Sequence, residues 1–168
     1  MDTSPHIMIL GIGNILFSDE GFGIRVIEKL TDLYEFSENV SLVDGGVLGM
    51  NLLGFISEAD QLIVVDVVRN GVQPGTLVRL EGGQIPARIR AKNSLHQVDF
   101  LEALTMCQVF DKVPQTVILG VEPQDIETLS DELTSSIQAK VDPMIEMVLA
   151  EIARRGASYW KKNNGLCA

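Results

Sequence analysis

The sequence has little of what disulfide-rich, membrane-spanning or nucleic-acid-binding proteins need. It contains two cysteines, Cys107 and Cys167, far apart and without Cys-x-x-Cys spacing, which predicts free thiols in a reducing compartment such as the cytoplasm. No apolar run approaches the roughly 20 residues of a membrane span. The first residues lack the basic and then apolar pattern of a signal peptide, so none is expected. A net charge of −10 without a basic run argues against nucleic-acid and membrane partners, although solubility alone explains that charge equally well.

The hydrophobic content is sufficient for one folded domain. Hydrophobic residues make up 46% of the 168 residues, which excludes a disordered chain. A chain of this length buries roughly 70% of the surface that it exposes when unfolded. We therefore predict a single domain over residues 1–168, with a core over 6–155 and a flexible tail over 156–168.

Apolar strands alternate with amphipathic helices along the chain, which is typical of a parallel sheet covered by helices. The predicted strands span residues 6–10, 40–43, 61–68, 76–81 (an edge strand) and 116–121. The predicted helices span residues 20–34, 48–57, 97–110 and 130–155, with Ser130 as a cap and Asp142-Pro143 as a kink or a restart. We predict an α/β three-layer sandwich, a doubly wound, twisted, mainly parallel sheet of about five strands with helices on both faces. The first three strands are expected in the order 2-1-3.

The predicted site lies at the switch point between the first and third strands, at their carboxyl ends. The turn at Gly11–Gly13 would normally cradle a phosphate against a helix, but two acids, Asp19 and Glu20, open this helix. Asp66 lies near the end of the third strand, and His96 follows a polar loop that returns over the same edge. Two carboxylates and one imidazole suit a divalent cation such as zinc, nickel or manganese, so we predict Glu20, Asp66 and His96 as metal ligands.

Each of these residues also has a purely structural interpretation. Glu20 is equally typical of an acid at a helix start, and His96 of a loop or cap histidine. Asp66 is harder to explain in this way, because a lone acid in a valine-rich buried strand is costly unless it is paired or coordinated. Asp44 ends the second strand near the same crevice, whereas His6 begins the first strand at the opposite end and is interpreted as structural.

Several short motifs, in this order and at these spacings, resemble those of the maturation endopeptidases that trim the large subunit of nickel-iron hydrogenases. The resemblance covers residues 6–155. The motifs are Gly11-x-Gly13-Asn14, Asp19-Glu20-Gly21-Phe22-Gly23, Asp44-Gly45-Gly46, Val65-Asp66, His96-Gln97, Gly120-Val121-Glu122-Pro123 and Leu129-Ser130. Two departures are visible: Val47 stands where many members have Thr, and Glu122 where others often have Gln.

The resemblance implies an endopeptidase that removes the C-terminal extension of the large-subunit precursor after nickel insertion. It implies a metal-contacting set at Glu20, Asp66 and His96, and a functional role for Asp44, so that Asp44, Glu20 and Asp66 are the expected catalytic residues. The expected cofactor is nickel, supplied by the precursor, with no organic cofactor. The enzyme is expected to be a cytoplasmic monomer with no nucleic-acid or membrane partner.

Other functions remain open from the sequence alone. One is a conventional metallopeptidase with its own bound divalent ion, and another is a non-catalytic chaperone that only checks for nickel. A nucleotide-binding module is a weaker alternative, because Leu16 stands where the third glycine of the dinucleotide fingerprint belongs and the acids at residues 19 and 20 would repel a pyrophosphate.

Overall fold

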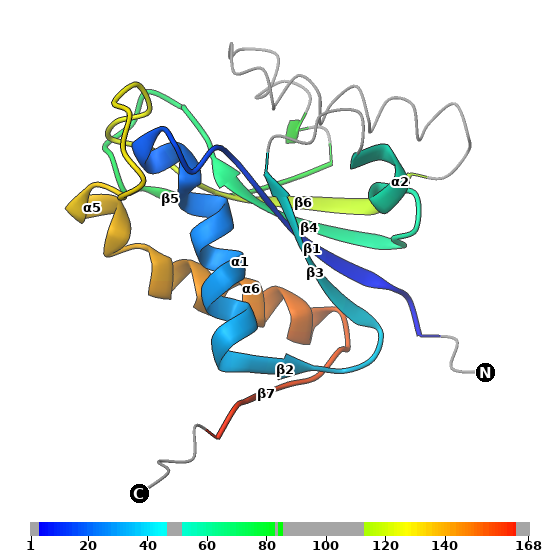
Figure 1. Ribbon diagram of the computed structural model, residues 1–168. Coiled ribbons are helices and arrows are strands. Elements are labelled where there is room, and N and C mark those ends of the chain that lie inside the picture. The colour runs from blue at the N-terminus through cyan, green and yellow to red at the C-terminus, as the bar shows by residue number, and fades with distance from the viewer. Residues whose placement is uncertain (1–3, 47–51, 83, 86–112, 164–168) are drawn as a thin grey trace, which may run out of the picture.

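The computed structural model describes residues 4–46, 52–82, 84–85 and 113–163 (Figure 1). His96, the two cysteines and the predicted helix over 97–110 lie outside these ranges. The described residues form a five-stranded sheet in the order β3-β1-β4-β6-β5, in which β5 alone runs antiparallel to its neighbour. The strands are β1 (Ile7–Ile12), β3 (Val40–Gly46), β4 (Gln61–Val67), β5 (Leu77–Glu81) and β6 (Gln115–Val121).

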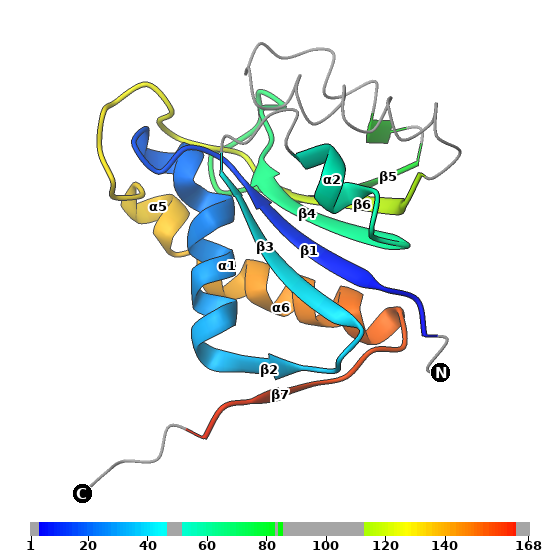
Figure 2. The same cartoon turned by 45° about the vertical axis from the view of Figure 1, so that its right-hand side comes forward.

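Helices cover both faces of the sheet, as Figures 1 and 2 show. On one face, α1 (Phe22–Leu33) and α6 (Val141–Arg154) pack against one set of alternating strand residues, including Ile9, Val65 and Leu119. On the other face, α2 (Leu52–Ile56) packs against the complementary set, including Leu10 and Val64. Because β1 and β4 are buried on both faces, they consist almost entirely of apolar residues.

The order β3-β1-β4 confirms the predicted 2-1-3 order of the first three strands, and β5 confirms the predicted edge strand. The chain leaves β1 toward β3 on one side and returns to β4 on the other, so the switch point lies between β1 and β4. In this register Gly11 of β1 pairs with Asp44 of β3 and with Val65 of β4. The predicted α/β sandwich is therefore confirmed, with the switch point where the sequence predicts it.

The segment from Ser130 to the last helix differs from the prediction. Ser130 does not cap a helix but forms a parallel bridge with Phe17, and helical structure resumes only at α5 (Ser135–Gln138). The acids after Ser130 favour a helix start locally, but the bridge holds this backbone in an extended conformation. Pro143 lies in the first turn of α6, where its missing N–H costs nothing, so the chain restarts a helix there.

The tail expected to be flexible from residue 156 is ordered through residue 163. Tyr159–Lys161 forms β7, which pairs antiparallel with β2 (Tyr34–Phe36) beyond the end of α1. The rings of Tyr34 and Tyr159 meet edge to face with centroids 6.0 Å apart, and Trp160 Nε1 donates to Glu35 Oε2 at 2.8 Å. The flexible-tail prediction is thus wrong for these residues, because a pairing partner some 125 residues away cannot be detected from the local sequence pattern.

Within the part of the chain described here, no helix is long and apolar enough to cross a membrane.

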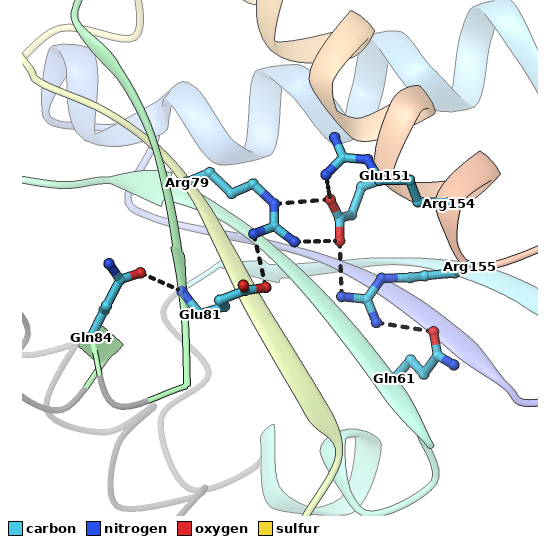
Figure 3. A network of polar contacts seen from close by, with 7 residues as sticks. All are labelled: Gln61, Arg79, Glu81, Gln84, Glu151, Arg154 and Arg155. Carbon is cyan, nitrogen blue, oxygen red and sulfur yellow. Dashed lines mark hydrogen bonds and ion pairs between the residues drawn. The ribbon is translucent and has the colours of Figure 1, made fainter.

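A buried carboxylate, that of Glu151 on α6, joins α6 to the edge strand β5 (Figure 3). Arg79 of β5 donates to both its oxygens, from Nε at 3.1 Å and from Nη2 at 3.0 Å. Arg154 and Arg155 pair with the same carboxylate at 3.0 and 3.1 Å. Burial opposes ionisation of Glu151, but Arg79, with Arg155 and Arg154, outweighs it and holds the pKa of this carboxyl below its ordinary 4.5.

Close contact between α1 and the sheet requires a glycine at the start of the helix. A Cβ on Gly23 would clash with the backbone carbonyl oxygens of Ile12 and Val65, at the ends of β1 and β4. Backbone oxygens cannot rotate away as a flexible side chain can. Gly23 therefore sets how closely the N-terminus of α1 approaches the switch point.

Replacing Gly23 by Ala should lower the free energy of unfolding by about 1–3 kcal/mol, because the added methyl group overpacks this contact. Gly54→Ala is the matched control, since nothing lies within 4 Å of a Cβ built on this helical glycine. That control should be neutral or stabilise by about 0.5–1 kcal/mol. Urea unfolding of both variants measures the difference, and equal stabilities would contradict the close contact.

Glu151→Gln should lower the free energy of unfolding by about 1–3 kcal/mol at pH 7, because a neutral amide cannot pair with three guanidinium groups. Since the pKa of Glu151 is lowered by folding, its stabilisation is complete above the ordinary 4.5 and is lost as the pH falls through the lower native value. The difference between wild type and variant should therefore shrink in acid. Unfolding curves at several pH values measure it, with Glu146→Gln, an exposed acid on the same helix, as the control. A difference that does not vary with pH would exclude this linkage.

Candidate active site

The turn after β1 folds back tightly and places Glu20 at the switch point. Gly13 has a φ of +144°, and a Cβ there would clash with the carbonyl oxygen of Glu20. Asn14 N donates to that same oxygen at 3.1 Å. Both Gly13 and Asn14 therefore contact the backbone of Glu20, which lies in the short 3₁₀ helix η1 (Ser18–Gly21).

Glu20 is buried, and its electrostatic environment links it to the end of β4. Burial raises the pKa of its carboxyl group, and the positive charge of Arg69 partly opposes this increase. Arg69 follows Asp66 by three residues, and η1 contacts β4 directly. The structure therefore brings Glu20 to the carboxyl end of the strand that carries Asp66, as the topology predicts.

Asp66 is buried as well, near the end of β4. Its Oδ1 accepts a hydrogen bond from the backbone N–H of Val67 at 2.7 Å. Val64 and Val68 both pack on the face covered by α2, and strand alternation places Asp66 on that same face. Glu20 comes to the same end of the sheet from η1, which contacts β4.

Asp44 lies near the end of β3 and is exposed. Its Oδ1 accepts the N–H of Gly46 at 3.0 Å, within a turn where Gly46 has a φ of +43°. Asp44 is in register with Gly11 and Val65, so two strand spacings, about 10 Å, separate its backbone from that of Val65, the residue before Asp66. Asp44 therefore flanks the switch point on its β3 side.

The carboxylates have the chemistry of a cation site. The oxygens of buried carboxylates are suitable ligands for a divalent ion. A cation near Glu20 would favour the ionised form of its carboxyl group, which burial disfavours. Within the described residues, no three His, Cys, Asp or Glu side chains are grouped so that they could hold a metal by themselves. His96, the third predicted ligand, lies outside the described residues.

Asp19 is a residue whose importance the sequence analysis missed. It is fully buried, and its oxygens accept the backbone N–H groups of Gln124, Asp125 and Thr134 at 2.8–2.9 Å and the Thr134 hydroxyl at 3.0 Å. Asp19 thereby fixes the loop of residues 122–134 beside η1 (Figure 1). In sequence it is one of two adjacent acids at a helix start, and no local pattern separates its role from that of Glu20.

Glu122 holds a second loop at this edge. The carboxylate is buried and accepts the N–H groups of Asn70 and Gly71, immediately after β4. The loop that carries Arg69 is thereby held beside the end of β6. His6, by contrast, lies at the amino end of β1, where Nδ1 contacts Glu58 O at 2.9 Å and Nε2 contacts Ser41 Oγ at 2.8 Å, which confirms its structural role.

A doubly wound sheet with buried carboxylates at its switch point defines an α/β protein with a ligand-binding or catalytic site at that edge. A family model described as hydrogenase maturation protease matches residues 24–151. The hydrogenase expression/formation protein HoxM of Azotobacter vinelandii is 39% identical over 156 residues, which cover 92% of this chain and 75% of that protein. The hydrogenase 2 maturation protease of Escherichia coli is 36% identical over 153 residues, covering 90% of this chain and 93% of that protein.

The solved structures agree with the sequence comparisons. The hydrogenase maturating endopeptidase HybD from E. coli superimposes with a TM-score of 0.90 at 32% identity, over 95% of this chain and 99% of that one. The chain therefore belongs to the hydrogenase maturation protease family, and it is a protease.

Removing the positive charge of Arg69 should raise the pKa of Glu20 further, because that charge favours the ionised carboxylate and opposes the effect of burial. Arg69→Gln tests this in a ¹³C NMR titration of the Glu20 carboxyl group. Lys161→Gln removes a charge from β7, beyond the far end of α1, and should leave that pKa unchanged. An unchanged pKa in Arg69→Gln would mean that Arg69 does not act on Glu20.

Proposed function

We propose that this protease removes the C-terminal extension of the large-subunit precursor of a nickel-iron hydrogenase after nickel insertion, and that it recognises the precursor through its metal. The observation that supports the proposal is that η1, which carries the buried Glu20, contacts β4, which carries the buried Asp66, in a chain that belongs to this family. Burial raises the pKa of Glu20, so a divalent cation is a favourable partner for it.

In this proposal Glu20, Asp66 and His96 complete the coordination of nickel that arrives with the precursor. The metal supplies polarisation of the scissile carbonyl group or activation of a water molecule. The protein residues position the substrate, because a precursor held at the switch point has its scissile peptide bond at the same edge of the sheet. Metal-dependent recognition also explains why an unloaded precursor would be left uncut.

Asp44 is the proposed general base. A carboxylate is a suitable acceptor for a proton from an attacking water molecule. Gly46 N donates to Oδ1 of Asp44, and Oδ2 is the oxygen assigned to that task.

We further propose that the protease acts in the cytoplasm, in keeping with two widely spaced cysteines. The decisive experiment mixes metal-stripped protease with nickel-loaded and nickel-free precursor and measures product masses. Cleavage of the loaded precursor alone supports the proposal. Cleavage of both forms, only after metal is returned to the protease, would instead establish a conventional metallopeptidase with a resident ion.

Glu20→Gln and Asp66→Asn should each fold normally and lose processing of loaded precursor by at least about 100-fold, because neither amide provides the anionic oxygens of a carboxylate. Circular dichroism and thermal unfolding check the fold, and product mass over time measures processing. Glu38→Gln changes an exposed acid before β3, at the far end of the sheet, and should process normally. Normal processing by both site variants would refute the assigned roles.

A further inference from the structure

Beside the switch point lies an exposed apolar surface, which we call the ledge. Two loops form it: the turn after β1 and the loop of residues 122–134 (Figure 2, blue and yellow). The apolar members and their exposed fractions are Ile15 (40%), Leu16 (56%), Phe17 (36%) and Leu129 (75%). Large apolar side chains gathered at one exposed place are typical of an interaction site.

Hydrogen bonds between the two loops hold the ledge in shape. Ser130 N donates to Leu16 O at 3.0 Å, and Ser18 N donates to Ser130 O at 2.8 Å. Ser18 Oγ donates to Glu132 O at 3.1 Å, and Asp19 binds both ends of the longer loop. The exposed side chains are therefore presented on a fixed backbone, which lowers the entropic cost of binding a partner.

The loop that carries Leu129 is rich in acids. Residues 122–139 include five acids and no Lys or Arg, and residues 13–24 include two acids and neither cation. The acids flanking Leu129 are Asp125, Glu127, Asp131 and Glu132, all on the longer loop. The guanidinium of Arg25 is already engaged there, by Glu28 Oε2 at 3.0 Å and Asp131 O at 2.8 Å. An apolar surface in this environment is complementary to an apolar segment that carries Lys or Arg.

The ledge is continuous with the candidate active site. Glu20 N donates to the carbonyl oxygen of Phe17 at 3.0 Å, so the apolar turn leads directly into η1. A protein chain bound at Glu20 and Asp66 therefore lies within reach of the ledge. Among the described residues, the exposed apolar side chains of this turn directly precede Glu20 in the chain.

We propose that the ledge docks an apolar, Lys- or Arg-bearing segment of the precursor next to the peptide bond that is cut. This inference rests on the proposed function and adds a second recognition element, independent of the metal. Contact with the metal distinguishes loaded from unloaded precursor, and contact with the ledge recognises the polypeptide chain that carries the metal. A second copy of this protein is a poorer occupant, because two ledges would bring acidic loops together in a chain with net charge −10.

The first test replaces apolar members of the ledge. Leu16→Ser/Leu129→Ser should raise KM for loaded precursor, and the Kd measured calorimetrically, by about tenfold, with kcat unchanged, since neither side chain is assigned to the reacting atoms. Both residues are more than half exposed, so the variant should fold. Val113→Ser is the matched control: this valine is 49% exposed before β6, at the opposite edge of the sheet, and its change should leave both constants unaltered.

The second test changes charge and leaves the apolar residues intact. Glu127→Gln/Glu132→Gln should raise KM several-fold at low ionic strength and lose most of that effect at high salt, because the acids act by electrostatic attraction. Glu146→Gln, an exposed acid on α6, should show no such dependence. An effect that is equal at all salt concentrations would contradict the assigned charge complementarity.

The outcomes separate the ledge from the proposed function. If wild type processes loaded precursor and Leu16→Ser/Leu129→Ser matches it in KM and Kd, the ledge proposal fails and the proposed function stands. If wild type binds precursor without cutting it, the proposed function fails and the Kd values decide the ledge. If wild type binds no precursor, both fail. A loss of self-association by sedimentation, with KM unchanged, would reassign the ledge to a contact between copies of this chain.

Discussion

The buried carboxylate of Asp19 is the interaction on which the described edge of this site depends. An isolated charge in the interior is costly, so its oxygens must be satisfied, and here three backbone N–H groups and a hydroxyl from residues 124–134 satisfy them. The result is that a loop more than 100 residues later in the chain is held against η1. Glu20, the next residue, and Leu129, on that loop, are placed together by the same bonds.

Two kinds of carboxylate therefore lie at one edge of the sheet. Asp19 and Glu122 accept backbone N–H groups and hold loops in place, whereas burial raises the pKa of Glu20 and the charge of Arg69 partly opposes this increase. Asp19 and Glu122 thus shape the site by holding its loops, whereas a cation beside Glu20 would favour its ionised form.

Much of the fold could be predicted because its strands are buried on both faces. The apolar runs of β1 and β4 have few alternatives to a parallel sheet, and right-handed crossovers then restrict the order of strands. Prediction was wrong where a distant partner overrides local preference. Phe17 bridges Ser130 across 113 residues and prevents the helix start expected there, and Tyr34 pairs with Lys161 and orders a tail that looked free.

The sequence by itself determined the sheet, the position of its switch point and the acids that could gather there, since these follow from apolar periodicity and from the spacing of turns. Only the tertiary structure decided what each acid does. Asp19 and Glu20 are adjacent and chemically alike, yet one accepts hydrogen bonds from the loop at 124–134 and the other lies near Arg69 beyond β4. Neighbouring side chains on a tight turn point in different directions, and the groups that they meet come from parts of the chain far away in sequence.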